Sequence, residues 1–597
     1  MNGSFGRSCR PPVRTTRLAA ALLLVLGATG AIAWHGVGSA SAATSAVVGA
    51  GSGRCLDVTG GAATSGAGVE LYDCNGQAGQ QWDATSAGEL RVFNDSMCLD
   101  AYQKGTTAGT EVDIYTCNGG ANQQWRVNAD GTITGVQSGL CLDATSGGTA
   151  NGTAIELWTC NGGSNQKWTV GSSSTTGGTT TGGTGSGGVY YVAPSGSDGA
   201  AGTQAAPWAT IAHAQSVAQP GDTVYVRGGT YTYTHADASC ASGTDRVDAI
   251  TLSRSGSSGK PITYAAYPGE KPHFDFAGVQ DNCRIKGFDV TGSWIHLKGL
   301  EVSGVPQNNN LNHESWGVWV SGSNNTFEQL NLHNNMGPGL FIQDGGGNLV
   351  LDCDSHDNYD SRTSNGAGES ADGFGAHITA NHPGNVFRGD RAWYNSDDGF
   401  DLINAYSSVT IEDSWAWKNG YIPETSTSAG NGNGFKAGGY GGDWDPDGVK
   451  HTVRDSVAFD NKAAGFYANH QTVADDIFNN TGYNNHPDFN MLGVSSSGAA
   501  IGIGNLRNNI AYGGTLTSNM SGTNAAYNTW NLGVTLSNSQ FQSVSTSGWD
   551  APRQADGSLP ALPYLHLAAG SALIDKGTNV GLPYNGSAPD LGAFETH

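Results

Sequence analysis

The chain has 597 residues, of which 91 are glycine and only 13% are charged, and its formal net charge is -23. This length predicts more than one domain. The acidic, glycine-rich composition excludes a basic surface for nucleic acid and is typical of a turn-rich protein. An acidic protein that handles an acidic polymer needs local positive charge, and a metal ion could supply it.

Residues 1–42 are predicted to be a secretory signal peptide. Four arginines between positions 7 and 17 precede the apolar run Leu18–Ala33, and Ala40–Ala42 offers the small residues of a cleavage site. A single membrane anchor is the alternative, but the apolar run is short for a span. No other apolar stretch is long enough to cross a bilayer. We therefore expect a secreted, extracellular monomer that has no membrane partner and can form disulfides.

Residues 43–170 contain a threefold repeat. Two sets of residues recur every 43 positions, Cys55 with Cys98 and Cys141, and Trp82 with Trp125 and Trp168. Within each unit a second cysteine follows 19 residues after the first. One disulfide in each unit is the economical interpretation, which predicts the pairs Cys55–Cys74, Cys98–Cys117 and Cys141–Cys160.

Each unit runs Cys-Leu-Asp, then an aromatic residue two positions before the second cysteine, then Gln-x-Trp. This pattern resembles the ricin-type β-trefoil lectins and carbohydrate-binding module family 13, in which the three tryptophans would be core. The resemblance implies three sugar pockets for plant cell-wall glycans, made of exposed aromatic, carboxylate and amide groups. The implied residues are Asp57, Tyr72 and Gln80; Asp100, Tyr115, Asn122 and Gln123; and Asp143, Trp158, Asn165 and Gln166. The first unit has Gly79 where the others carry an asparagine.

Residues 171–188 consist of Gly, Ser and Thr alone, which predicts a flexible linker without a core. Residues 189–597 are the second predicted domain. Its opening resembles the entry of many β-helix proteins, where one short helix, here about Ile211–Ala218, covers the open end. The number of cysteines in this region suggests that Cys240 pairs with Cys283 and that Cys353 is buried and free.

A short phrase recurs in the second domain with its charged residues exchanged. It reads Asp372-Gly-Phe-Gly375, then Asp398-Gly-Phe-Asp401, then Asn433-Gly-Phe-Lys436, with an echo at Ala464-Gly-Phe-Tyr467. Strand-like segments separate the phrases and no helical period is present, which predicts a β-solenoid. If the phrases occupy equivalent positions on successive coils, their phenylalanines stack in one interior column, and the residue after each Phe points outward.

Further strands of the coils are predicted in six segments of four residues, which begin at Trp294, Asn325, Asn348, Asn385, Val409 and His451. Asparagines near the turns are interpreted as structural, because their side chains cap backbone groups there. These are Asn334, Asn335, Asn358, Asn395, Asn419 and Asn461. Loops such as 420–431 are expected to protrude as groove walls. Aromatic residues such as Trp415 and Trp417 either line that groove or pack within the solenoid.

The same register predicts a carboxylate cluster. It places Asp401 beside Lys436 and Asp372 beside Asp398, with Asp397 next to them, because neighbouring strands lie about 4.8 Å apart. Such a cluster repels itself unless a cation lies in it, and Ca²⁺, which takes about six to eight oxygen ligands, suits it better than Mg²⁺. A lysine beside bound Ca²⁺ is a candidate base. The alternatives are ordinary Asp-Gly turns and a solvated ion pair.

The segments Ser370–His377, Asn395–Leu402 and Gly432–Gly439 resemble the core of polysaccharide lyase family 9, the pectate lyases built on a right-handed parallel β-helix. The likeness covers most of residues 189–597 and implies an all-β chain, a β-trefoil joined by a linker to such a helix. It also implies Ca²⁺ bound by Asp372, Asp397, Asp398 and Asp401, with Lys436 as the base. The implied reaction is β-elimination on polygalacturonate (homogalacturonan), which yields 4,5-unsaturated oligogalacturonides.

Three alternatives remain open from the sequence. A β-helix hydrolase of the polygalacturonase kind would use Asp397 and Asp398 as acid and base without a metal. Two phrases, Gly-His-Gly and Arg-Ile-Lys, are expected of that family, and Gly-His-Gly is absent. A rhamnogalacturonan lyase would use the same elimination chemistry on another pectic polymer. A non-catalytic polysaccharide-binding protein would bind without forming any product.

Overall fold

The computed structural model describes residues 46–596 except for 75–76, 86–87, 94–95, 129–130, 171–186, 236–245, 308–313 and 364–365. The predicted signal peptide, nearly all of the predicted linker, and Cys240 lie outside these residues. Within them, no helix has the length and apolar character that a membrane span requires.

Residues 46–170 form a β-trefoil of twelve short strands, in agreement with the predicted fold. The strands are β1 (Val47–Gly49), β2 (Cys55–Val58), β3 (Ala67–Tyr72), β4 (Trp82–Ala84), β5 (Leu90–Val92), β6 (Met97–Ala101), β7 (Thr110–Thr116), β8 (Trp125–Val127), β9 (Ile133–Gly135), β10 (Cys141–Ala144), β11 (Thr153–Trp158) and β12 (Trp168–Val170). Six 3₁₀ turns connect them: η1 (Thr59–Gly61), η2 (Ala78–Gln80), η3 (Tyr102–Lys104), η4 (Ala121–Gln123), η5 (Thr145–Gly147) and η6 (Ser164–Gln166).

The threefold repeat has the structural role that its spacing predicts. Trp82, Trp125 and Trp168 are buried in one core, and each indole N–H donates a 2.9 Å hydrogen bond to a backbone carbonyl oxygen. The three predicted disulfides are present, each between cysteines 19 residues apart. The repeat therefore specifies both the core and the covalent links of this domain.

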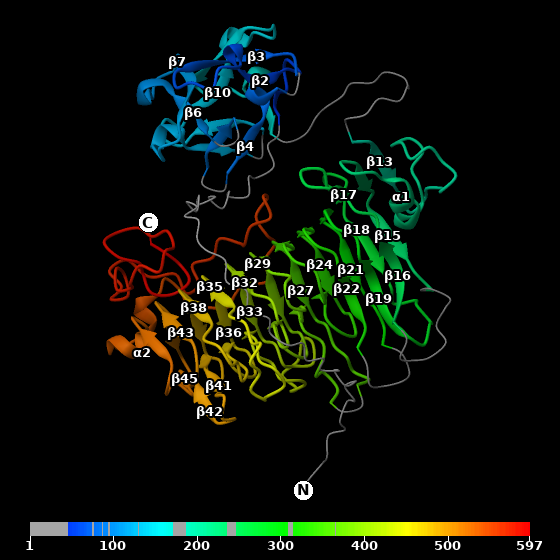
Figure 1. Cartoon of the computed structure of the whole chain (residues 1–597), viewed down its shortest axis with the longest axis vertical. Helices are drawn as coiled ribbons and strands as arrows, with labels where there is room; N and C mark the ends of the chain where they lie inside the picture. The colour runs from blue at the N-terminus through cyan, green and yellow to red at the C-terminus, as the bar shows by residue number, and fades with distance from the viewer. Residues whose placement is uncertain are drawn as a thin grey trace, which may run out of the picture. The chain divides into compact units, whose positions relative to one another are not determined.

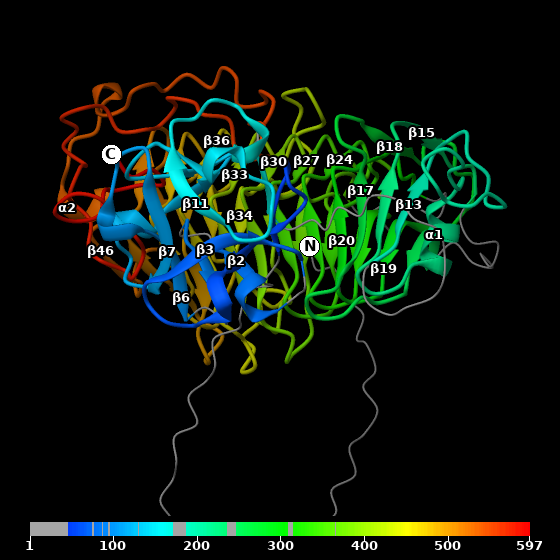
Figure 2. The same cartoon turned by 90° about the horizontal axis from the view of Figure 1, so that it is seen from above.

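The described part of residues 189–526 forms a parallel β-helix, whose coils build three parallel sheets (Figures 1 and 2). Sheet I contains β13 (Val189–Val192), β14 (Thr223–Val226), β17 (Ile262–Ala266), β20 (Ile295–Lys298), β23 (Thr326–Glu328), β26 (Leu349–Leu351), β29 (Asn385–Arg388), β32 (Val409–Glu412), β35 (Thr452–Arg454), β38 (Asp476–Phe478), β43 (Asn505–Arg507) and β46 (Asn524–Ala526). Six neighbouring members, β20 to β35, match the six segments predicted from sequence.

Sheet II contains β15 (Gly229–Thr232), β18 (Pro272–Asp275), β21 (Glu301–Ser303), β24 (Asn331–His333), β27 (Asp354–His356), β30 (Arg391–Trp393), β33 (Trp415–Trp417), β36 (Val457–Phe459), β39 (Thr481–Tyr483) and β44 (Ile510–Tyr512). Sheet III contains β16 (Arg246–Leu252), β19 (Arg284–Val290), β22 (Trp316–Val320), β25 (Leu340–Ile342), β28 (Phe374–Ala376), β31 (Phe400–Asp401), β34 (Phe435–Lys436), β37 (Phe466–Tyr467), β40 (Phe489–Asn490) and β45 (Thr517–Ser518). The remaining elements are the hairpin β41 (Leu492–Val494) and β42 (Ala500–Gly502), helices α1 (Ile211–Val217) and α2 (Thr529–Leu532), and η7 (Asn538–Gln540).

The predicted terminal helix is present as α1, at the β13 end of the coils. It begins after Thr210, whose side-chain oxygen accepts the His213 backbone N–H at 3.0 Å and so caps the first turn. Ile211 and Ala214 are buried in the interior of the β-helix, so the helix covers the first coil with apolar side chains.

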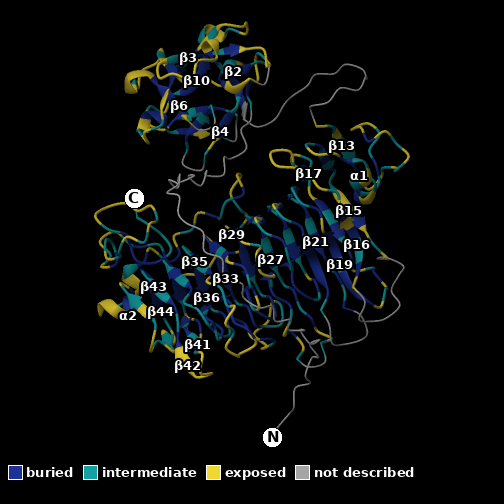
Figure 3. Ribbon diagram, viewed as in Figure 1, coloured by how far each residue is buried: buried dark blue, intermediate teal, exposed yellow. Residues whose placement is uncertain are grey.

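The interior of the β-helix is held by stacked side chains. Phe374, Phe400, Phe435 and Phe466 lie in register on neighbouring strands, and successive rings are 5.1, 4.9 and 5.0 Å apart, as predicted. Figure 3 shows that the strands of the coils are mostly buried.

Buried asparagines form a second stack between sheets II and III. Asn395 N–H donates to the Asn419 side-chain oxygen, and Asn419 N–H to that of Asn461, both at 3.1 Å. The Asn335 backbone N–H donates to the Asn358 side-chain oxygen at 3.0 Å, and the Asn358 side-chain nitrogen donates to the Asn395 side-chain oxygen at 2.8 Å. The structural interpretation of these residues is therefore confirmed.

The C-terminal segment packs on the outer face of sheet II. Trp549 and Tyr564 join one apolar cluster with Trp415, Trp417 and Phe459. Arg391 binds this segment through the Trp549 carbonyl oxygen at 3.0 Å. Of the two roles open for Trp415 and Trp417, packing is therefore correct, because they lie on sheet II and the phrase residues lie on sheet III.

The two remaining cysteine predictions have different outcomes. Cys353 is free and buried, as expected. Cys283 is disulfide-bonded, but the suggested partner Cys240 lies outside the described residues, so that pairing stays a prediction.

Candidate active site

The recurring phrase forms two outward columns on sheet III. Asp372 and Asp398 lie two residues before the stacked phenylalanines, and Asn433 follows them on the next coil. The second column runs along the strands as Gly375, Asp401, Lys436 and Tyr467, with each residue in register with the next. The register predicted for Asp401 and Lys436 is confirmed.

The glycine in each phrase is required by packing. A Cβ atom on Gly399 would lie 2.6 Å from the Gly434 carbonyl oxygen and 2.9 Å from the side-chain nitrogen of Asn419. A Cβ atom on Gly373 would be obstructed in the same way by the Gly399 carbonyl oxygen and the Asn395 side-chain nitrogen. The chain therefore bends at these glycines and enters strands β28 and β31 directly after them, against the asparagine ladder.

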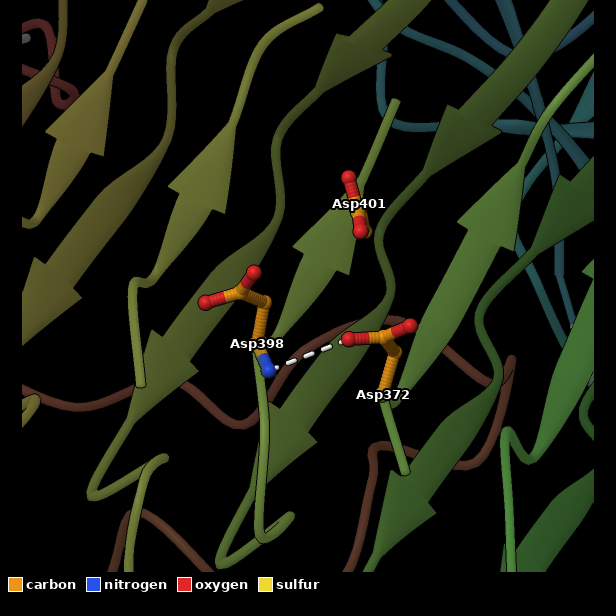
Figure 4. A group of neighbouring side chains, drawn as sticks. All are labelled: Asp372, Asp398 and Asp401. Atoms are coloured by element: carbon orange, nitrogen blue, oxygen red, sulfur yellow. Dashed lines mark hydrogen bonds between the residues drawn. The ribbon is translucent and has the colours of Figure 1, made fainter. Parts of the chain in front are cut away.

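Asp372, Asp398 and Asp401 form a compact acidic group (Figure 4). Each offers one oxygen atom within 4.8 Å of the others, and all three residues are buried, with exposed fractions of 4%, 0% and 4%. The Asp398 backbone N–H donates to Asp372 Oδ1 at 3.1 Å, which is the bond drawn in Figure 4. Asp398 Oδ1 in turn accepts the Asn433 backbone N–H at 2.6 Å.

Asp397 is buried but is not a member of this group of three. Its Oδ1 accepts the backbone N–H of Asn431 at 2.7 Å, at the end of the loop 420–431. Lys462 holds the same loop by donating to the Ala429 carbonyl oxygen at 3.2 Å. The structure thus brings together three of the four predicted metal ligands and uses the fourth to anchor a loop.

Lys436 lies at the edge of the acidic group. Its Nζ is 3.0 Å from Asp401 Oδ2, to which it donates a hydrogen bond, and 3.0 Å from Asp398 Oδ2. The Asp398 contact lacks hydrogen-bond geometry, so Asp398 Oδ2 is a buried oxygen without a hydrogen-bond donor among the described residues. His377 Nε2 lies 3.8 Å from Asp401 Oδ2. Tyr467 lies on the other side of Lys436, on the next strand of the sheet.

The neighbouring carboxylates repel one another, and this repulsion shifts the pKa values of the group. Burial raises the pKa of Asp372 well above its ordinary value, and the neighbouring carboxylates raise it further. Burial and the negative charge of Asp398 also raise the pKa of Asp397 well above its ordinary value. Burial tends to lower the pKa of Lys436, but Asp398, Asp401 and their neighbours together raise it well above its ordinary value.

The acidic group fits a hard cation. All of its donor atoms are carboxylate oxygens, which Ca²⁺ prefers. Asp398 Oδ2 is buried, and among the described residues its one polar partner is the Lys436 ammonium, 3.0 Å away in an ion pair. A bound cation would satisfy that oxygen and remove the repulsion that raises the pKa of Asp372. The interpretation of Lys436 as a solvated ion pair is wrong, because the residue is 8% exposed.

A pocket of about 390 Å³ opens beside Lys436. Its lining residues come from the phrases, from the loop after β34 and from the next coil: Ile403, Asn431, Asn433, Lys436, Gly441, Gly442, Tyr467, Asn469 and His470. Tyr467 belongs to the fourth phrase, which the sequence analysis noted only as an echo. The sequence places Tyr467 in the outward position after the stacked Phe466, but the residue carries no charge that would mark it as a candidate for the site.

The trefoil domain assembles the predicted pocket residues in each repeat. Asp100 accepts hydrogen bonds from Asn122 at 2.7 and 2.8 Å and from Gln123 at 2.9 Å. Asp143 accepts from Asn165 at 2.9 Å and Gln166 at 2.7 Å, whereas Asp57 accepts from Gln80 alone, at 2.9 Å. Tyr72, Tyr115 and Trp158 are exposed beside them, at 41%, 48% and 42%.

A second carboxylate lies directly across the strand pair in every repeat, and sequence reasoning missed it. Glu70 is in register with Asp57, Asp113 with Asp100, and Glu156 with Asp143. Burial and the Asp100 charge raise the pKa of Asp113 to about 7. The signal was present, because Glu70, Asp113 and Glu156 recur with the same spacing of 43 residues as the cysteines.

Residues 190–509 match the family described as the Pel9A-like right-handed β-helix region, and residues 43–168 match the ricin-type β-trefoil lectin domain. The first match spans more than half of the chain. The chain therefore belongs to the Pel9A-like β-helix family, polysaccharide lyase family 9, and is a polysaccharide lyase with an N-terminal ricin-type trefoil.

Several relatives share this β-helix. Pectate lyase L of Dickeya chrysanthemi is 37% identical over 413 residues, which cover 68% of this chain and 90% of the relative. Pectate lyase PEL9 of Emericella nidulans is 32% identical and covers 64% and 93%. The crystal structure of pectate lyase Pel9A aligns with a TM-score of 0.58 at 36% identity, covering 69% and 97%. A solved rhamnogalacturonan lyase aligns with a TM-score of 0.60 at 34% identity, covering 64% and 97%.

Membership in a lyase family supports a catalytic protein over the non-catalytic alternative and over the hydrolase. An Arg-Ile-Lys phrase, the other phrase expected of the hydrolase family, does occur at Arg284–Lys286. It lies on β19, four strands from β31 in sheet III, and Lys286 Nζ is paired with Asp248 at 3.2 Å and Asp289 at 3.1 Å. The phrase is therefore not part of a site with Asp397 and Asp398.

Proposed function

We propose that this protein is a Ca²⁺-dependent pectate lyase, which cleaves polygalacturonate by β-elimination to 4,5-unsaturated oligogalacturonides. The observation that carries the proposal is the position of Lys436, 3.0 Å from both Asp398 and Asp401 at the edge of a buried acidic group. A base beside an oxygen-rich cation site suits the removal of a proton next to a carboxylate. The named pectate lyase relatives support the choice of substrate.

Each residue has a separate role in this proposal. Ca²⁺ held by Asp372, Asp398 and Asp401, with Asp397 as a further oxygen donor, would neutralise the uronate carboxylate and stabilise the charge that develops on it. Lys436 Nζ accepts the C5 proton as a neutral amine, after which the C4–O4 bond breaks. Asp401 orients Nζ through its 3.0 Å hydrogen bond. Burial of these side chains keeps bulk water away from the amine.

Rhamnogalacturonan is a second candidate substrate. The observation in its favour is the alignment with the solved rhamnogalacturonan lyase. The same base would act on it, because this polymer also carries a uronate with a proton at C5. An assay on each polymer distinguishes the two candidate substrates.

The first experiment follows the ultraviolet absorbance of the conjugated double bond as the protein meets polygalacturonate or rhamnogalacturonan. We expect absorbance to rise with polygalacturonate in the presence of Ca²⁺ and to stop when a chelator is added. Reducing ends without absorbance, unaffected by chelator, would instead identify a hydrolase. A rise only with rhamnogalacturonan would move the proposal to the second candidate.

The metal proposal has its own readout. A cation that binds the folded state alone raises the thermal midpoint as its concentration rises above the Kd. We expect added Ca²⁺ to raise the midpoint of the native protein. We expect little shift for Asp398→Asn, which keeps an oxygen for Asn433 but removes the charge. Equal shifts for both proteins would place the cation elsewhere.

The trefoil and the N-terminal segment complete the proposal. We propose that the three trefoil pockets bind plant cell-wall glycans, since their exposed aromatic residues lie beside hydrogen-bonded carboxylates. We also propose that the protein is a secreted monomer that loses residues 1–42. The mass of the exported protein tests the loss of residues 1–42, and its hydrodynamic size tests whether it is a monomer.

A further inference from the structure

The proposed elimination needs a proton for the leaving oxygen O4, and none of the residues assigned so far supplies it. Asp372, Asp398 and Asp401 are acceptors, and Lys436 is the base. An alcohol leaves slowly as an alkoxide, so a positioned acid beside O4 is worth about 10²- to 10⁴-fold in rate. The surroundings of Lys436 can be searched for such a donor.

The geometry of the substrate limits where O4 can lie. C5 carries a proton, the carboxyl carbon, C4 and the ring oxygen. When the proton faces Lys436 and the carboxylate faces the acidic group on β28 and β31, C4 extends away from that group. Across Lys436 from Asp401 the next residue in register is Tyr467 on β37, about 4.8 Å further along the column. Of the two remaining substituents of C5, C4 and the ring oxygen, the pose with C4 toward β37 brings O4 to Tyr467.

Apart from Lys436, the described pocket side chains that can donate to a substrate oxygen are Tyr467 and its neighbour His470, and Tyr467 is the one in register with Lys436. Asn469 already donates to the Gly438 carbonyl oxygen at 2.9 Å, Asn431 to Glu369 at 3.1 Å, and Asn433 to Asp398 at 2.8 Å. Tyr467 is partly exposed, and among the described residues its hydroxyl has only a 3.5 Å contact with His470 Nδ1. A substrate oxygen can therefore take its hydrogen bond.

We propose that Tyr467 is the general acid of the elimination and that His470 is a positioning residue for its hydroxyl. The inference rests on the proposed lyase function. As Lys436 takes the C5 proton, the electrons of the C5–H bond form the C4=C5 double bond, the C4–O4 bond breaks, and O4 takes the Tyr467 proton. Solvent then returns a proton to the tyrosinate, and the Lys436 ammonium releases one to solvent.

The state of the hydroxyl agrees with this role. Burial raises the pKa of Tyr467 above its ordinary value, although the Lys436 charge acts in the opposite direction. The raised pKa favours the protonated phenol, which is the form that can donate to O4. The same column thus holds the base and the acid as neighbours.

The test compares two leaving groups in Tyr467→Phe. On polygalacturonate we expect kcat to fall by about 10²- to 10⁴-fold, with the thermal midpoint unchanged. An oligogalacturonide whose non-reducing unit carries 4-nitrophenoxide at C4 needs no proton on departure, so the variant should release nitrophenol at close to the native rate. Tyr483→Phe on sheet II, which removes one hydroxyl from another partly buried tyrosine, is the control and should be native on both substrates.

Either of two results would overturn the assignment. Native kcat on polygalacturonate in Tyr467→Phe would remove Tyr467 from the reaction, and an equal loss on both substrates would leave it a positioning role only. His470→Gln gives a second measurement: a loss on the polymer that vanishes in the Tyr467→Phe background supports coupling, and additive losses contradict it. A native protein inactive on both pectic polymers would refute the proposed function itself.

Discussion

Lys436 depends on its neighbours for both its position and its charge. We expect Lys436→Met to lose at least about 10²- to 10⁴-fold in kcat, as is typical for a general base, while Lys418→Met, on the far side of the coil, stays native. Because the carboxylates raise the pKa of Lys436, the fraction of neutral amine grows with pH, so the native rate should rise into the alkaline range. Initial absorbance rates from pH 6 to 10 measure both effects. A flat native profile, or near-native activity in the methionine variant, would contradict the role of Lys436.

His451 makes a pH-dependent contribution to stability. It is fully buried, Nδ1 accepts the Val409 backbone N–H at 3.2 Å, and burial lowers its pKa from about 6.5 to about 4. The unfolded chain therefore binds one more proton between these pH values, and the stabilisation present above pH 6.5 is lost as the pH falls through this window. The shift corresponds to about 3 kcal/mol.

The variant His451→Asn isolates this effect. Asparagine occupies the equivalent position on earlier coils, where Asn348 and Asn385 accept the same backbone bond, so the variant keeps the acceptor and loses the titrating ring. Asp475, which accepts the His451 backbone N–H, titrates in both proteins and cancels in the comparison. We expect the thermal midpoint to fall less between pH 7 and pH 4.5 in the variant. Parallel profiles would show that His451 is not the group responsible.

At the scale of the strand, the phrase glycines set how closely the coils stack. We expect Gly399→Ala to lower the free energy of unfolding by about 1 to 3 kcal/mol, the usual cost of overpacking, because the new methyl group meets the Gly434 carbonyl oxygen and the asparagine ladder. Gly199→Ala is the matched control, since its Cβ would have no neighbour closer than 3.8 Å. Thermal midpoints of the two variants measure the difference, and equal midpoints would contradict the packing argument.

Strand register was the part of the fold most open to prediction. The phrases carry a two-residue alternation, so aligning their phenylalanines also aligned Asp401 with Lys436. Asp397 was harder, because its partner Asn431 comes from a loop whose path has no sequence period. Tyr467 was visible as an outward position but lacked a charged neighbour in sequence. Trp417 shows the same limit, since its packing partner Trp549 is far along the chain.

At the scale of the whole molecule, the acidic group on sheet III and the acidic trefoil pockets differ in what they can bind. The carboxylates on sheet III form a compact group that fits a cation, whereas each trefoil pocket pairs two carboxylates, of which amide side chains hold one. Asp100 with Asp113 and Asp143 with Glu156 would repel a sugar carboxylate. Under the proposed function we therefore expect the acidic polymer to bind at the β-helix and neutral sugars to bind at the trefoil.

This separation predicts the binding preference of the trefoil. In the inactive Lys436→Met protein, which leaves polymers intact, we expect retardation in gels that contain neutral galactan or arabinan, and competition by neutral sugars but not by galacturonate. Trp158→Ala and Tyr115→Ala should each weaken the retardation, because each removes one exposed stacking surface. Tyr72→Ala should have the smallest effect, since the first pocket lacks the asparagine that holds Asp100 and Asp143 in the other two. Stronger retention on polygalacturonate under chelator, where the proposed metal site is empty, would contradict the charge argument and assign the acidic polymer to the trefoil as well.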